Sequence, residues 1–335
     1  MLLDDLQSVL ETAGSVKILA SLKNDKLQYP NEKDIRIMIP DLHLLSNRGR
    51  SALGATGPAP THALLLKVLQ AVTQFRLSVK ADADSVCAVY FMGDMLDLWR
   101  EAPSGTDTSV VAGAIIQDHL PLFAAACSPD LKARVICGNH DFRLHEASSF
   151  GAADRRYYFP SVSPTSLCLH GDVFDWIEDF PDLFNETIVY YTSPFLSLLD
   201  HMKNDIEKLM KPDRNDAPTF EPTRAITPCT SLEDAAALHP LWKRAWETSK
   251  KTNADFNLGL RSIIIGHTHS PRIVAYEDGP DFLALIDTGA WLQDTLSNDA
   301  ASAEQGTIGA ICGNEVRLFH MEDFKSGDGP KSSTV

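Results

Sequence analysis

Short apolar runs recur along this chain, and each is bounded by Gly, Pro or Asp. They lie at 35–40, 86–93, 134–138, 166–171, 262–266, 282–289, 307–313 and 315–320. Their lengths and their β-branched residues favour strands over helices. Helical patterns over 61–75 and 108–126 separate the first three runs, so these three strands are expected to be parallel, with right-handed crossovers. The later runs lack such helices between them, which predicts an antiparallel or mixed sheet.

The segments around these runs suggest one main domain over 35–322 with additions. Residues 1–34 carry apolar residues at helical spacing and are expected to form a helical N-terminal extension. From about 180 to 258 the pattern changes to a helical insertion, with helices expected over 195–210 and 235–251. The polar tail over 323–335 is predicted to be disordered.

Composition excludes several classes of protein. The 335 residues are 44% hydrophobic and 22% charged, as in a globular protein, and carry a net charge of −15. So acidic a chain is poorly suited to binding duplex nucleic acid or an anionic membrane. No apolar run approaches the roughly 20 residues of a membrane span, and no signal peptide is predicted. The six cysteines include no CxxC pair, which favours a thiol-reduced, cytoplasmic protein.

Polar side chains follow nearly every predicted strand directly. They are Asp41 and His43, Asp94 and Asp97, Asn139, His140 and Asp141, His170, and finally His267 and His269. In layered α/β folds the strand ends cluster on one edge, and ligands bind at that edge. Several distant segments are therefore expected to converge on one site.

The chemical types in this set indicate a metal centre. Imidazole, carboxylate and amide donors without a thiolate suit divalent ions such as Mn²⁺, Fe²⁺, Zn²⁺ or Ni²⁺. The Asp-x-His and His-x-His spacings let alternate side chains of an extended segment reach neighbouring metal positions. A carboxylate such as Asp94 can bridge two ions about 3.5–4 Å apart.

The ordered motifs D-x-H, G-D-x-x-D, G-N-H-D, H and G-H-x-H resemble those of the calcineurin-like metallophosphoesterase superfamily, over about 35–290. The resemblance implies an α/β sandwich of two mixed β-sheets flanked by helices, with two divalent metal ions, Mn²⁺ being the first choice. One ion would be held by Asp41, His43, Asp94 and His269, and the other by Asp94, Asn139, His170 and His267.

The same resemblance assigns the chemistry. It implies hydrolysis of a phosphate mono- or diester by a metal-bridging hydroxide. His140 matches the family's catalytic general acid, and Asp97 matches the carboxylate that orients it. Asp141 is open between a turn-stabilising role and a role behind the metal ligands.

Flanking residues also resemble one branch, the UDP-2,3-diacylglucosamine hydrolases of lipid A synthesis. The segments DLHL, YFMGDMLDLW, GNHDF, LHGD, GHTHSP and DTGAW carry this likeness. That branch usually has Arg where this chain has His140, and Glu where it has Asp97. Hydrolysis of a nucleotide-linked pyrophosphate is therefore kept as an alternative. A nuclease and a non-catalytic scaffold with this fold are two further alternatives.

Substrate contacts are less defined by the sequence. The expected partner is a small phosphorylated molecule, with nucleotide-linked compounds among the candidates, and the oligomeric state is left open. Arg143 and His145 follow the GNHD motif and must lie near the site. Arg48 and Arg50 follow the first metal motif and are candidates to grip a phosphate, although solvated loop charges are the more common outcome.

Overall fold

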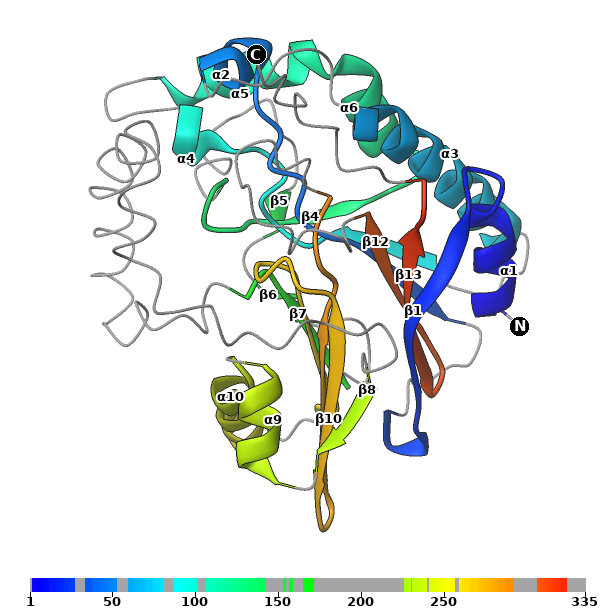
Figure 1. Cartoon of the computed structure of the whole chain (residues 1–335), viewed down its shortest axis with the longest axis vertical. Helices are drawn as coiled ribbons and strands as arrows, with labels where there is room; N and C mark the ends of the chain where they lie inside the picture. Colours follow the sequence, from blue (N-terminus) through cyan, green and yellow to red (C-terminus); the bar gives the residue numbers. More distant parts are fainter. Residues whose placement is uncertain are drawn as a thin grey trace, which may run out of the picture.

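The computed structural model describes residues 2–27, 34–52, 60–80, 87–101, 107–141, 153–154, 157–158, 165–171, 226–229, 231–239, 241–256, 259–291 and 306–323. Within these residues the chain forms two β-sheets and several helices in layers (Figure 1). Each sheet contains both parallel and antiparallel neighbours. The prediction of an α/β fold with two mixed sheets is confirmed.

The first sheet has the strand order β1-β13-β12-β2-β3-β4-β5 in the described part of the chain. Its strands are β1 (Val16–Lys23), β13 (Glu315–Met321), β12 (Thr307–Cys312), β2 (Ile35–Ile39), β3 (Cys87–Phe91), β4 (Arg134–Ile136) and β5 (Ala153–Asp154). From β2 to β5 the neighbours are parallel, as predicted for the first three runs. The carboxyl ends of β2, β3 and β4 therefore lie at one edge.

The second sheet has the order β6-β7-β9-β11-β10-β8. Its strands are β6 (Tyr157–Tyr158), β7 (Ser166–Leu169), β9 (Ser262–Ile265), β11 (Asp281–Asp287), β10 (Arg272–Asp278) and β8 (Ile226–Cys229). Strands β7, β9 and β11 are parallel, and β10 is antiparallel to β11. The ends of β7 and β9 thus also share an edge.

Three apolar clusters hold the layers together. One lies between the sheets and joins Met38 and Tyr90 of the first sheet to Ile264 and Ile286 of the second. The other two lie on the outer faces of the sheets and contact the helices. Strand β2 shows the alternation expected of a strand, because Ile35, Ile37 and Ile39 enter the outer cluster and Met38 the inner one.

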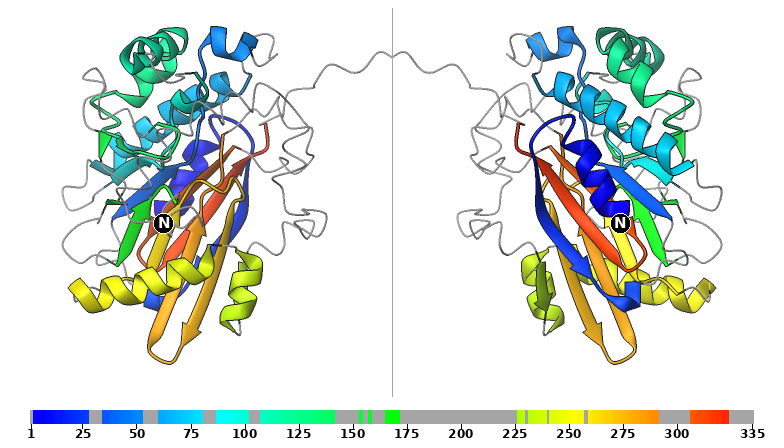
Figure 2. Two further views of the ribbon diagram at one scale, coloured as in Figure 1. Left: turned by 90° about the vertical axis from the view of Figure 1, so that its left-hand side faces the viewer. Right: turned by 90° about the vertical axis from the view of Figure 1, so that its right-hand side faces the viewer.

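The helices cover the two outer faces (Figure 2). The first sheet carries α1 (Leu2–Leu10), α3 (Pro60–Lys80), α5 (Thr108–Asp118) and α6 (Leu120–Ala126), and the second carries α9 (Leu232–Leu238) and α10 (Trp242–Phe256). Three short helical segments are η1 (Asp25–Leu27), α2 (Asn47–Ala52) and α4 (Leu98–Glu101). In α3 the inward residues repeat every three or four positions, as on one face of a helix: Leu65, Val68, Leu69, Val72 and Phe75.

The N-terminal extension is only partly helical. The predicted helix is present over Leu2–Leu10, but Val16–Lys23 is the edge strand β1, antiparallel to β13. Hydrogen bonds to a strand some 300 residues later fix this segment as a strand, and local periodicity does not report such a partner.

Two predicted helices are each divided in the structure. The segment 108–126 forms α5 and α6, which bend by 97° at His119, because Pro121 in the first turn of α6 cannot donate the hydrogen bond that would continue α5. The segment 235–251 overlaps α9 and α10, with Pro240 of the sequence at the break. The insertion also contains strand β8.

Other predictions fall outside the described residues, namely the helix at 195–210 and residues 324–335 of the tail. Among the described helices, none alone is long and apolar enough to cross a membrane. The pair α5 and α6 meets the criteria of length and composition only when its two bent parts are joined.

Candidate metal centre

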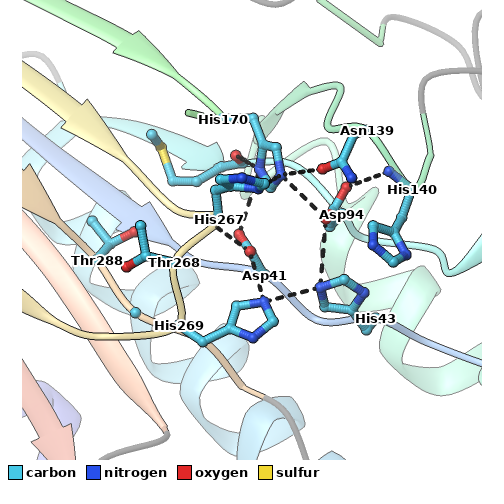
Figure 3. A network of polar contacts seen from close by, with 12 residues as sticks. Asp41, His43, Asp94, Asn139, His140, His170, His267, Thr268, His269 and Thr288 are labelled. Carbon is cyan, nitrogen blue, oxygen red and sulfur yellow. Dashed lines mark hydrogen bonds and ion pairs between the residues drawn. The ribbon is translucent and has the colours of Figure 1, made fainter. Parts of the chain in front are cut away.

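Loops at the carboxyl ends of five strands converge on one site (Figure 3). After β2 come Asp41 and His43, after β3 Asp94, after β4 Asn139 and His140, after β7 His170, and after β9 His267 and His269. Three of these strands belong to the first sheet and two to the second. All seven residues predicted to bind metal are therefore brought together at the edge that the strand pattern indicated.

The backbone of this site is strained at the predicted ligands. His43, Asp94, His267 and His269 have φ values of 43°, 46°, 67° and 56°. Among the described non-glycine residues only Lys132 also has a positive φ. Such conformations cost about 1–3 kcal/mol each, and they persist where the surrounding structure enforces them, most often at functional sites.

Two glycines allow the loops to approach the carboxylates closely. A Cβ added to Gly138 would lie 2.1 Å from Asp94 Oδ1, and one added to Gly266 would lie 2.2 Å from Asp41 Oδ1. Neither distance is compatible with a side chain. The glycines of GNHD and GHTH are thus required by the packing of the carboxylates.

The first ligand group consists of Asp41, His43 and His269. The distance from His43 Nε2 to His269 Nε2 is 3.2 Å, and that from His269 Nε2 to Asp41 Oδ2 is 3.3 Å. His43 Nε2 also lies 3.5 Å from Asp94 Oδ2. Ligand atoms about 2.1 Å from a common ion are separated by about 3.0–3.4 Å, so this group has the spacing of a coordination shell.

The second group consists of Asp94, His170 and His267, with Asn139 beside them. His170 Nε2 lies 3.1 Å from Asp94 Oδ2, 3.1 Å from Asn139 Oδ1 and 3.2 Å from His267 Nδ1. These distances match a second coordination shell, and Asp94 Oδ2, 3.5 Å from His43 Nε2, lies between the two groups.

The hydrogen bond of His170 to Met92 leaves its Nε2 directed at the second group. Its Nδ1 is 3.0 Å from the carbonyl oxygen of Met92, which can only accept, so Nδ1 carries the proton. In the neutral ring, Nε2 then presents a lone pair towards the oxygens of Asp94 and Asn139. Lone pairs that converge in this way repel one another unless a cation lies between them.

Burial and neighbouring charges shift the pKa values of two predicted ligands. Burial alone would raise the pKa of Asp94, but His170, His140 and His43 hold it well below its usual range. Burial, aided by the nearby His140, lowers the pKa of His43. An ionised carboxylate and a neutral imidazole are the forms that coordinate an ion.

His140 and Asp97 form a pair beside the ligand groups. His140 Nδ1 lies 2.9 Å from Asp97 Oδ1, and the His140 ring packs edge-on against His43 with centroids 4.5 Å apart. The side chain of His140 is 13% exposed, whereas Asp97 is fully buried. Asp97 Oδ2 is also 3.5 Å from His43 Nδ1, so the Asp97 carboxylate lies beside both His140 and His43.

Asp141 has a clear role in holding the loops. One oxygen accepts from the backbone N–H of Gly138 at 2.7 Å and the other from that of Met95 at 2.7 Å. Burial, reinforced by Asp94, raises the pKa of Asp141 to about 8, while these backbone donors oppose the rise. The sequence left its role open, and in the structure it ties the GNHD loop to the GDMLD loop.

Of the four residues predicted to contact substrate, Arg48 and Arg50 lie within the described residues. Arg48 is exposed and Arg50 partly buried on α2, four residues and more beyond His43. Burial lowers the pKa of Arg50. The backbone N–H and hydroxyl of Ser46, just before α2, both donate to Glu101. Arg143 and His145 lie outside the described residues.

Comparison with known proteins adds no family. No protein-family model matches the chain, and no curated protein is significantly similar to it. The interpretation of this centre therefore depends on its own residues and geometry.

Proposed function

We propose that this protein is a dinuclear metal-dependent phosphoesterase of the calcineurin-like metallophosphoesterase type, which hydrolyses a phosphate mono- or diester. The observation that carries the proposal is a pair of adjacent ligand groups, with Asp94 of the second group 3.5 Å from His43 of the first and with His140 and Asp97 directly beside them. Two adjacent cation positions next to a proton donor are what hydrolysis of a phosphate ester requires.

Seven side chains would hold the ions. Asp41, His43 and His269 would bind the first, His170, His267 and Asn139 the second, and Asp94 would contribute to both. Nitrogen and oxygen donors without sulfur suit Mn²⁺, Fe²⁺, Zn²⁺ or Ni²⁺. With two divalent ions bound, the centre would supply Lewis-acid polarisation of the phosphoryl group and an activated water nucleophile.

His140 would then handle the proton of the reaction. Its Nδ1 is held by Asp97, so Nε2 would donate a proton to the leaving oxygen as the ester bond to phosphorus breaks. Asp97 fixes the orientation of the ring, and the backbone N–H of His140 donates to Asp94 Oδ1 at 2.8 Å. The loop thereby holds the donor at a constant position relative to the ligands.

Hydrolysis of p-nitrophenyl phosphate and of bis-p-nitrophenyl phosphate tests the proposal. Protein stripped with a chelator is expected to regain turnover when Mn²⁺ is added. His140→Asn should reduce turnover about 10²–10⁴-fold while two ions still bind, and Asp41→Asn should reduce ion binding itself. His320→Asn, on β13 and outside the ligand groups, is the matched control.

The metal count of His140→Asn also separates two roles for this residue. His140 lies within reach of His43 and Asp94, so it is a possible ligand of an ion by distance alone. Loss of an ion in His140→Asn would make it a ligand and overturn its assignment as proton donor. Two bound ions with neither ester cleaved would contradict the esterase and favour a nucleotide-linked pyrophosphate or a non-catalytic scaffold.

A further inference from the structure

A buried polar chain connects the helical layer over the second sheet to the loop that carries His267 and His269. It runs from His239, between α9 and α10, through Asp287 at the end of β11, to Thr268 in the GHTH loop. His239 and Asp287 are both fully buried. None of these three residues is a ligand or the proton donor of the proposed function.

The contacts of His239 show which atom donates at each step of this chain of hydrogen bonds. The backbone N–H of Leu241 donates to His239 Nδ1 at 3.2 Å, so Nδ1 is unprotonated and Nε2 carries the proton. His239 Nε2–H therefore donates to Asp287 Oδ2 at 3.1 Å. The same oxygen accepts from the hydroxyl of Thr268, and Asp287 Oδ1 accepts from the N–H of Gly289 at 3.0 Å.

Thr268 links this chain to the backbone of the ligand loop. Its hydroxyl donates to Asp287 and accepts from the N–H of Ser270 at 3.2 Å. It therefore anchors to the end of β11 a loop in which His267 and His269 have φ values of 67° and 56°. Two adjoining strained residues on either side of Thr268 need such a constraint to stay in place.

His239 and Asp287 are buried polar residues beside an apolar cluster. The surrounding cluster is apolar and includes Leu285, Ile265 and Trp242. Replacing both partners of a buried hydrogen bond by apolar groups of the same shape can be nearly neutral or even stabilising. Stability alone therefore does not account for His239 and Asp287, whereas orienting the ligand loop does.

We propose that His239, Asp287 and Thr268 are positioning residues, through which the α9–α10 layer sets the geometry of His267 and His269. This inference rests on the proposed function, because it takes these two histidines as metal ligands. One histidine belongs to each ligand group, so the chain acts on both cation positions.

Mn²⁺ titration of the metal-free full-length protein, followed by calorimetry, tests the inference. Thr268→Val and His239→Leu remove the hydrogen bonds with little change in volume and should weaken Mn²⁺ binding about 10–100-fold. Thr268→Ser keeps the hydroxyl, so it should bind Mn²⁺ more tightly than Thr268→Val. His239→Gln keeps a donor near the position of Nε2, so it should bind Mn²⁺ more tightly than His239→Leu. Ser249→Ala is the control, since its buried hydroxyl donates to the carbonyl oxygen of Trp246 within α10.

Hydrogen exchange of residues 266–270 in the metal-free protein is the second readout. Exchange should accelerate in Thr268→Val but not in Ser249→Ala, since only the former releases the loop. If His239→Leu does not fold, the comparison of Thr268→Val with Thr268→Ser decides. Mn²⁺ affinity equal to wild type in Thr268→Val, whatever its melting temperature, would overturn the inference.

The two proposals fail in different ways. Wild-type protein that binds Mn²⁺ but cleaves no ester would remove the esterase and leave the positioning role standing if the variants weaken binding. Wild-type protein that binds no divalent ion would overturn both.

Discussion

Replacing Gly138 by alanine should weaken ion binding at the proposed metal centre strongly while leaving the fold in place. The added Cβ would lie 2.1 Å from Asp94 Oδ1, 2.8 Å from its Cγ and 2.7 Å from its backbone nitrogen. A rotation of the Asp94 side chain relieves the first two contacts but not the third. Gly138 does not have a positive φ, so alanine is allowed there by its backbone, and the collision alone is tested.

The size of the effect follows from these distances. A carbon and an oxygen in contact are normally about 3.3–3.6 Å apart, so Asp94 Oδ1 must move by about 1.2 Å or more. Metal–ligand distances tolerate only about 0.2 Å. Because Asp94 serves both ligand groups, both ions should bind at least about 100-fold more weakly. The overpacking should lower the free energy of unfolding by about 1–3 kcal/mol.

Calorimetric Mn²⁺ titration, with a thermal melt of the same samples, measures both quantities. Gly113→Ala is the control, because Gly113 lies in α5 with no atom within 4 Å of an added Cβ. It should leave Mn²⁺ binding unchanged and stabilise the protein by about 0.5–1 kcal/mol. Two ions bound with wild-type affinity by Gly138→Ala would refute the reasoning.

Three further predictions concern single positions. Gly266→Ala should weaken binding of one ion and spare that of the other, because its Cβ would collide with the carboxylate of Asp41, a ligand in the first group alone. Metal analysis that finds both ions retained or both lost would contradict this. Asp97→Asn should lower turnover about 10–100-fold, since it frees the ring of His140, and steady-state kinetics beside the wild type would show it. Burial above all lowers the pKa of His62 to about 3, so the unfolded chain takes up a proton below pH 6.5 that the folded chain does not. Stability should therefore fall as the pH drops from 6.5 towards 3, by up to about 2 kcal/mol at pH 5, and His62→Gln should show a smaller loss in denaturant melts.

The sequence predicts the position of the site well because its signals are local. Each ligand follows an apolar strand directly, and parallel strands must end at a common edge, so Asp41, Asp94 and Asn139 are placed together without a structure. The separation of the ligands into two groups came from the resemblance to a family, and the distances around His170 agree with it.

Other features depend on partners far apart in the chain. Asp141 bonds to the backbone of Met95, and Asp287 bonds to His239 across 48 residues. No periodicity reports such contacts, since they arise only when the layers pack. Strand β1 is a similar case, because its helical or extended state is decided by β13. The left-handed backbone at His43 and His267 also has no sequence signal, since neither is glycine or asparagine.

The ligands come from both sheets, and this has a consequence for how the centre assembles. Asp41 and His269 are 228 positions apart and reach one another only after the two sheets have docked. Under the proposed function, ion binding would therefore complete only after the two sheets have docked, and a bound ion would hold the sheets together. A substitution in the apolar layer between the sheets, at Met38 or Ile264, would thus change ion affinity from a distance, because it would alter how the two sheets pack and so the distances between ligands from different sheets.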